Sequence, residues 1–106
     1  MKTDNFNQLL EYILARARQS LSSKGHEYST EEDKLHNFKR AAQILGVTTE
    51  QALMGMYIKH LVSVLDMIDN INKGIYPTKE LLEEKNKDSI NYHILLEAII
   101  RENMGE

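Results

Sequence analysis

Acidic side chains are spaced so that they could meet across a pair of helices. Asp66 and Asp69 lie three residues apart, and Glu84 and Asp88 lie four apart. Positions three and four apart share one face of a helix. The short turn around Pro77 predicts that the two helices are antiparallel neighbours. If both faces meet, four carboxylates surround one small volume.

Such a volume suits Mg²⁺, a hard cation that takes carboxylates, water and phosphate oxygens as ligands. The predicted metal ligands are Asp66, Asp69, Glu84 and Asp88. With a phosphate chain polarised by the metal, water could attack it, and Asp66 or Asp88 would be the catalytic carboxylate. The alternative is that these acids are solvated on the outer faces of ordinary helices, as most charged side chains are. The sequence leaves both interpretations open.

Polar residues in three other places could hold a nucleotide. Lys24 offers a point charge to a phosphate, Tyr28 offers a ring that could stack on a base, and Asn37 could pair with a base edge. Lys59 shares a helix face with Asp66 and is a second candidate phosphate contact. Lys24 and Lys59 are equally explained as solvated lysines, and Tyr28 as a hydrophobic staple at a helix start.

Asn91 and Tyr92 follow Asp88 by about one helical turn and are predicted to contact the base or the sugar. The four histidines lack the spacing of a zinc site, and the chain has no cysteine. A zinc centre and a cysteine nucleophile are therefore excluded. No glycine-rich phosphate loop is present either.

Four stretches of helical period must position these side chains, whereas strand patterns are almost absent. The single proline and most glycines fall in the gaps between them. The predicted helices cover about residues 4–21, 30–45, 49–72 and 78–103. The pattern predicts a single all-α domain over residues 1–106, a four-helix bundle-like arrangement. The third stretch is apolar on most sides, which indicates a central helix that also serves as a subunit interface of a homodimer.

Composition excludes several classes of function. The chain has 106 residues, a size typical of one domain, and a net charge of −3. That charge argues against a double-stranded nucleic-acid binder, which usually carries a basic stripe. No apolar run is long enough for a membrane span or a signal peptide, so we expect a cytoplasmic protein without membrane contact.

The acidic pairs carry a family resemblance. Asp66-x-x-Asp69, then Glu84 and Asp88, with Asn91 and Tyr92 leading into an apolar helix, resembles the acidic helix pair of MazG-like all-α nucleoside triphosphate pyrophosphohydrolases. The family pattern is Glu-x-x-Glu followed by Glu-x-x-Asp. In this chain the first pair has the same spacing but shorter side chains, and the two acids of the second pair are one residue further apart. The resemblance implies Mg²⁺-dependent cleavage between the α- and β-phosphates.

Small phage and prophage proteins of uncharacterised function share a second pattern with this chain. It consists, in order, of Lys24, Tyr28, Asn37-Phe38, Lys59 and Asp88…Tyr92. The resemblance covers about residues 24–96 and implies nucleotide binding. Two alternatives stay open: a protein that sequesters a nucleotide without cleaving it, and a dimeric helical interaction module.

Overall fold

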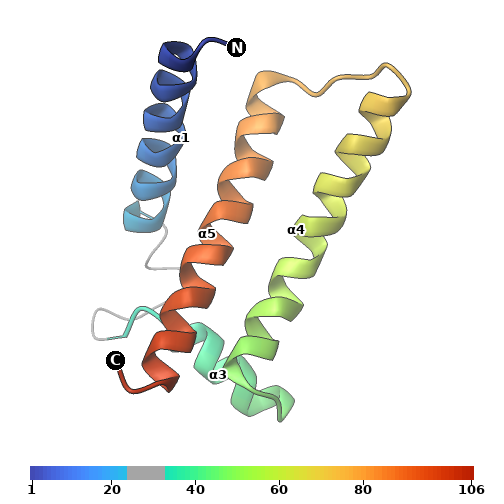
Figure 1. Cartoon of the computed structure of the whole chain (residues 1–106). Coiled ribbons are helices and arrows are strands. Elements are labelled where there is room, and N and C mark those ends of the chain that lie inside the picture. Colours follow the sequence, from blue (N-terminus) through green and yellow to red (C-terminus); the bar gives the residue numbers. More distant parts are fainter. Residues whose placement is uncertain (24–32) are drawn as a thin grey trace.

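The computed structural model describes residues 1–23 and 33–106, and the regular structure in these residues is α-helical. The helices are α1 (Thr3–Ser23), α3 (His36–Leu45), α4 (Thr49–Asn72) and α5 (Lys79–Asn103) (Figure 1). No strand occurs in these residues, which confirms the all-α prediction. None of the described helices is both long and apolar enough to cross a bilayer.

Local signals in the sequence explain where the helices begin and end. Thr48 and Gln51 form a reciprocal capping box at the start of α4, and Thr78 accepts a hydrogen bond from a backbone N–H at the start of α5. At the end of α3, Gly46 takes a left-handed conformation with φ of 69° and donates its N–H to the carbonyl of Ala42. A glycine adopts this conformation without steric cost.

The second predicted helix differs at its start. The described part begins at His36 as α3, while the predicted start at residue 30 lies outside the described residues. Asp33 Oδ1 accepts a hydrogen bond from the backbone N–H of Leu35 at 2.9 Å, and Asp33 Oδ2 accepts one from Lys39 Nζ at 2.7 Å. An aspartate bonded to the backbone two residues ahead favours a turn. The helix therefore begins only after this turn.

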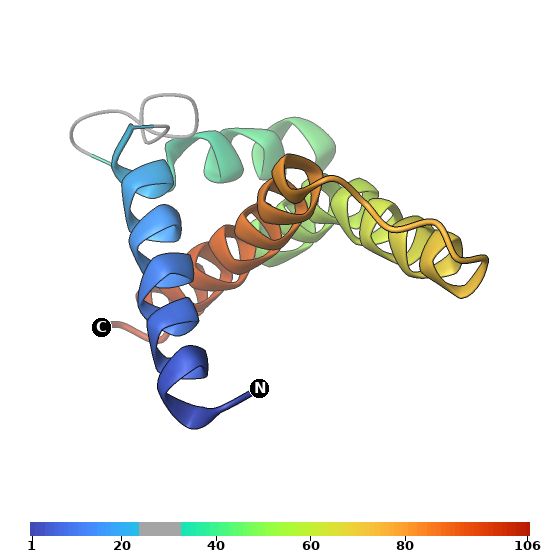
Figure 2. The same cartoon turned by 90° about the horizontal axis from the view of Figure 1, so that it is seen from above.

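Helix α5 lies in the middle of the molecule, with α1 on one side and antiparallel α4 on the other (Figure 1). Helix α3 packs across the N-terminal end of α4 (Figures 1 and 2). The core therefore lies where α3, α4 and α5 meet. Its buried members are Leu35, Phe38, Leu53, Tyr57, Tyr92 and Ile99.

The prediction of a central helix at residues 49–72 is wrong for the single chain. Helix α4 lies at the outer edge, with α3 and α5 against one side of it only (Figure 2). Its buried residues are therefore confined to Ala52, Leu53 and Tyr57. The remaining apolar surface of α4 does not pack against another helix of the described residues.

Candidate binding pocket

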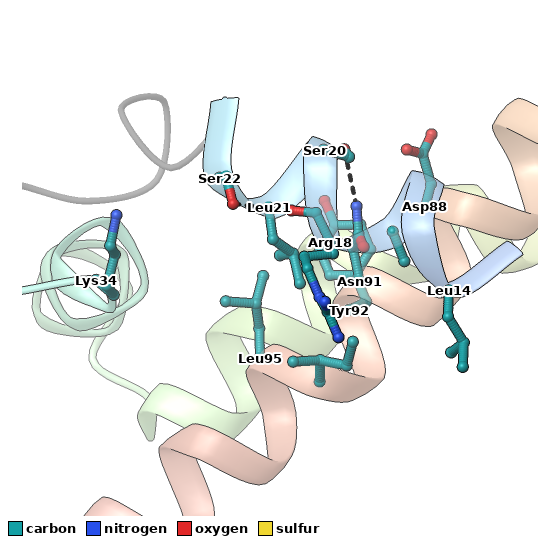
Figure 3. Close-up of a pocket in the computed structure, with 12 residues that line it drawn as sticks. Leu14, Arg18, Ser20, Leu21, Ser22, Lys34, Asp88, Asn91, Tyr92 and Leu95 are labelled. Atoms are coloured by element: carbon teal, nitrogen blue, oxygen red, sulfur yellow. Dashed lines mark hydrogen bonds between the residues drawn. The ribbon is translucent and has the colours of Figure 1, made fainter. Parts of the chain in front are cut away.

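A pocket of about 510 Å³ lies between α1 and α5, close to the turn that precedes α3 (Figure 3). This volume is in the range of about 300–1,000 Å³ that is typical of small-molecule sites. Most of the wall surface is apolar, and its apolar residues are Leu14, Ala17, Leu21, Ile94 and Leu95. Ala17 and Ser20 are small and lie three residues apart, so α1 can approach α5 closely here.

Asn91 places a polar group in this apolar pocket. Its Nδ2 donates a hydrogen bond to Ser20 Oγ at 3.0 Å, as Figure 3 shows, while its Oδ1 is buried without a partner among the described residues. Turning the amide over would exchange the two atoms and still leave one unpaired. A buried polar group without a partner costs about 1–3 kcal/mol. A ligand that pairs with this amide would recover that free energy.

Two cations border the pocket. Arg18 comes from α1 and Lys34 from the turn before α3, and both side chains are exposed. Neither forms an ion pair with a residue in the described ranges. By contrast, Arg16, half a turn earlier, lies 3.3 Å from a carboxylate oxygen of Glu83. Arg18 and Lys34 are therefore available to an anion, and a guanidinium suits a phosphate especially well.

Asp88 lies at the other end of the pocket from Lys34, with Arg18 between them (Figure 3). Its Oδ2 is 3.6 Å from His60 Nδ1, across the α4–α5 interface. Asp88 is half-buried and gives this end of the pocket a negative character. A phosphate is therefore favoured at the Lys34 end of the pocket.

Tyr92 lines the pocket but is a core residue with only 7% of its surface exposed. Its ring stacks on Tyr57 with centroids 5.2 Å apart and planes 4° apart, and His60 tilts against it at 5.1 Å. The hydroxyl of Tyr57 is in turn 3.2 Å from His93 Nε2. These contacts with α4 fix the α5 wall, so Tyr92 offers a ligand part of a rigid surface.

The four predicted metal ligands do not gather within one chain. Helices α4 and α5 diverge toward the connection over residues 73–78, near which Asp66, Asp69 and Glu84 lie exposed (Figure 1). Only Asp88 faces the pocket. Within residues 1–23 and 33–106, no group of three or more histidines or acids is placed to hold a metal ion. The donor set therefore does not fit Mg²⁺ as it stands.

A lysine occupies part of the interface where the ion was expected. Lys85 of α5 reaches across to α4 and donates a hydrogen bond to the carbonyl of Ser63 at 3.2 Å and another to the hydroxyl of Ser63. Its ammonium supplies positive charge between the two helices without a metal. The magnesium site stays a prediction of the sequence.

The predicted nucleotide contacts are divided between the pocket and other surfaces. Asn91 and Tyr92 line the pocket, whereas Lys59 is exposed on α4 and Asn37 is half-buried on α3. Phe38, the neighbour of Asn37, is fully buried, as expected of a core residue. Lys24 and Tyr28 lie outside the described residues.

Sequence reasoning missed the contributions of α1 and of the turn before α3. Arg18, Ser20 and Lys34 line the pocket, but none belongs to the patterns that pointed to a nucleotide. The spacing of Ala17 and Ser20 was the available signal, because two small residues on one face indicate close helix packing. Which helix packs there cannot be read from that spacing.

Comparison of the chain with protein-family models, with curated proteins and with solved structures found no match. The resemblance to MazG-like enzymes therefore rests on the residue patterns alone.

Proposed function

We propose that this protein binds a small phosphorylated ligand of the nucleotide class in the pocket between α1 and α5. The observation that carries the proposal is the unpaired, buried amide atom of Asn91, set among apolar walls and bordered by two cations. A nucleotide matches all three features. Its base or sugar has donors and acceptors for the amide, its ring has apolar faces, and its phosphates are anionic.

The charges of the pocket suggest the orientation of the ligand. The phosphates lie toward Lys34 and Arg18, because Asp88 repels them from the opposite end. The base or sugar then lies against Asn91, with Leu14 and Ile94 in reach of its faces. In this orientation, three of the site residues predicted from the sequence lie beside the ligand: Asp88, Asn91 and Tyr92.

Binding without cleavage is the form of this function that the geometry favours. Asp66 and Asp69 are exposed on α4 and away from Asp88, the one predicted metal ligand that lines the pocket. Nucleotide sequestration therefore agrees better with the chain than pyrophosphohydrolysis does. Mg²⁺-dependent cleavage stays the second candidate, supported by the sequence resemblance.

The protein is also proposed to act as a homodimer. The radius of gyration is 15.9 Å, whereas a compact domain of about 100 residues has one of about 13 Å. The accessible surface is 7722 Å² for 12.3 kDa, whereas a compact monomer of this mass exposes about 6,100 Å². A standard interface takes about 800 Å² from each partner. The excess surface is large enough to supply one.

Isothermal titration calorimetry with nucleosides and their mono-, di- and triphosphates tests the binding proposal. We expect affinity to rise with the number of phosphates. Arg18→Gln should weaken binding of a triphosphate about tenfold, because a charge-assisted hydrogen bond contributes about 1.5 kcal/mol or more. Arg40→Gln is the matched control, since Arg40 lies on α3 and bonds Gln43. Absence of binding by every nucleotide, or equal losses in both variants, would contradict the proposal.

Pyrophosphate release with and without Mg²⁺ separates the two forms of the function. Sequestration predicts binding with no release of pyrophosphate. Release that needs Mg²⁺ and disappears in Asp88→Asn would instead establish the enzyme.

A further inference from the structure

Helix α4 carries a regular apolar stripe on the side that α3 and α5 leave uncovered. Its members are spaced alternately four and three residues apart, the pattern that lets two helices pack side by side. Each is between 39% and 54% exposed. We call this stripe the outer seam; it consists of Met54, Ile58, Leu61, Leu65 and Ile68.

The outer seam is separate from the residues that α4 uses inside the chain. Leu53 and Tyr57 are buried against the core, one residue before Met54 and Ile58. One residue corresponds to about 100° around a helix, so the seam points well away from the core contacts. In Figure 2 the outer edge of α4 carries no other helix. This surface is therefore free to pack against another molecule.

We infer that two copies of this chain pair through the outer seam, with their α4 helices antiparallel. The inference rests on the proposed homodimer and adds its interface and orientation. It is independent of whether the pocket binds a nucleotide.

The order of residues in the seam supports the antiparallel pairing. The seam is nearly palindromic about Leu61, so a two-fold axis at Leu61 places that residue opposite its own copy. Met54 then lies opposite Ile68, and Ile58 lies one residue from the position opposite Leu65. Every apolar member thus meets an apolar partner, as a two-fold interface requires. The excess accessible surface of the chain is sufficient for such an interface.

The charges on α4 favour the same orientation. Asp66 and Asp69 are exposed near one end of the seam, and Lys59 is exposed near its middle. None of the three forms an ion pair with another residue of the described part. Parallel pairing would bring the four acids of two copies onto the same turns, where they repel one another. Antiparallel pairing separates the acids and brings each Lys59 toward the acidic end of the other copy.

Sedimentation equilibrium of the full chain tests the interface. The wild type should be a dimer, and Leu61→Glu should be a monomer that keeps the wild-type helical circular dichroism. Glutamate is a good helix former and seam residues are partly exposed, so the fold should tolerate the change. Ile44→Glu, at a 71% exposed apolar position on α3, is the control and should stay dimeric. A dimer that survives Leu61→Glu would overturn this interface but keep the homodimer. A monomeric wild type would overturn both.

Cysteine cross-linking tests the orientation, because the chain has no cysteine of its own. Under mild oxidation, Leu61→Cys should form a disulfide-linked dimer, and a mixture of Met54→Cys with Ile68→Cys should form a mixed one. Met54→Cys alone should not cross-link to itself, since the two positions lie at opposite ends of the paired helices. Efficient cross-linking of Met54→Cys alone would overturn the antiparallel orientation.

Discussion

The proposed function depends on Asn91 more than on any other single residue. Its amide has one atom bonded to Ser20 and one left unpaired in an apolar pocket. In the free protein such an atom lowers stability, and in a complex it supplies specificity. In the proposed complex, the ligand pairs with this atom.

Asn91→Leu removes the unpaired polar atom and keeps the branched shape of the side chain. We expect the free energy of unfolding to stay within about 1 kcal/mol of wild type or to rise, because relief of the unpaired atom offsets the lost bond to Ser20. Nucleotide binding should be lost. Asn86→Leu, at an exposed position of the same helix, is the control and should keep binding. Urea denaturation and calorimetry measure both effects, and retained affinity in Asn91→Leu would argue against the amide as a ligand contact.

The Asp33–Lys39 pair predicts how stability changes with pH. The hydrogen bond from Lys39, and then that from the backbone N–H of Leu35, lower the pKa of Asp33 below its ordinary value of 3.8. Since the folded-state pKa is the lower one, the stabilisation is complete above the ordinary value. It is lost as pH falls through the folded-state pKa.

Asp33→Asn should therefore be less stable than wild type near neutral pH, and the difference should shrink on acidification from about pH 5 to about pH 2. The bonds to Asp33 and then to Glu102 raise the pKa of Lys39, so the pair also persists up to the ordinary lysine value of 10.5. Urea denaturation over this range is the measurement. A stability difference that does not vary with pH would show that the ion pair is not its cause.

At the scale of elements, α1 packs on one helix, α5, among the helices that the structure describes. Glu83 is the main polar anchor of this contact. The hydroxyl of Tyr12 donates to the Glu83 carboxylate at 2.6 Å, and Arg16 lies 3.3 Å from it. Because the pocket lies between α1 and α5, this attachment also maintains the candidate pocket.

Glu83→Ala should loosen α1 without unfolding the core. We expect amide hydrogen exchange in α1 to become about 5- to 30-fold faster, which corresponds to about 1–2 kcal/mol of lost local stability. Exchange in the buried part of α4 around Leu53 should stay at its wild-type rate. Glu84→Ala, at the next residue on an exposed part of α5, should leave α1 unchanged. Faster exchange across all helices would mean that α1 belongs to one cooperative unit with the core.

The sequence predicted the helical elements better than their packing. Capping residues such as Thr48 and Thr78, and the stop at Gly46, act on the nearest turn of chain and can be read directly. The acids at Asp66 and Glu84 were assigned to a shared site because their helices are antiparallel neighbours. The helices diverge toward their connection, and no local pattern encodes that divergence (Figure 1).

The candidate site was predicted in part for the same reason. Asn91 and Asp88 were found because they share a face of one helix with apolar neighbours. Lys34 was not, because it comes from the turn before α3, and Arg18 was not, because its place at the pocket depends on how α1 meets α5. That contact joins residues about 70 positions apart, as the bonds from Tyr12 to Glu83 and from Asn91 to Ser20 show.

At the scale of the whole molecule, the chain is more open than a compact monomer of its size. Its radius of gyration and accessible surface exceed those of a compact monomer, and the outer seam of α4 accounts for part of the excess. Burial of this seam between two copies would give α4 the central place that its apolar composition indicates.

Pairing of two chains makes thermal stability depend on protein concentration. The melting temperature of the wild type should rise as concentration rises. The Leu61→Glu chain should melt lower and at a temperature independent of concentration. Scanning calorimetry at several concentrations measures this, and a constant melting temperature for the wild type would contradict the homodimer.

The most direct test of nucleotide binding is an NMR titration that follows the side-chain amide signals of Asn91, assigned by their loss in Asn91→Leu. As a nucleoside triphosphate is added, these signals should shift and saturate together with the backbone amide of Arg18, while the backbone amide of Arg40 stays in place. Saturable shifts confined to other parts of the chain, or no shift at all, would contradict a nucleotide pocket between α1 and α5.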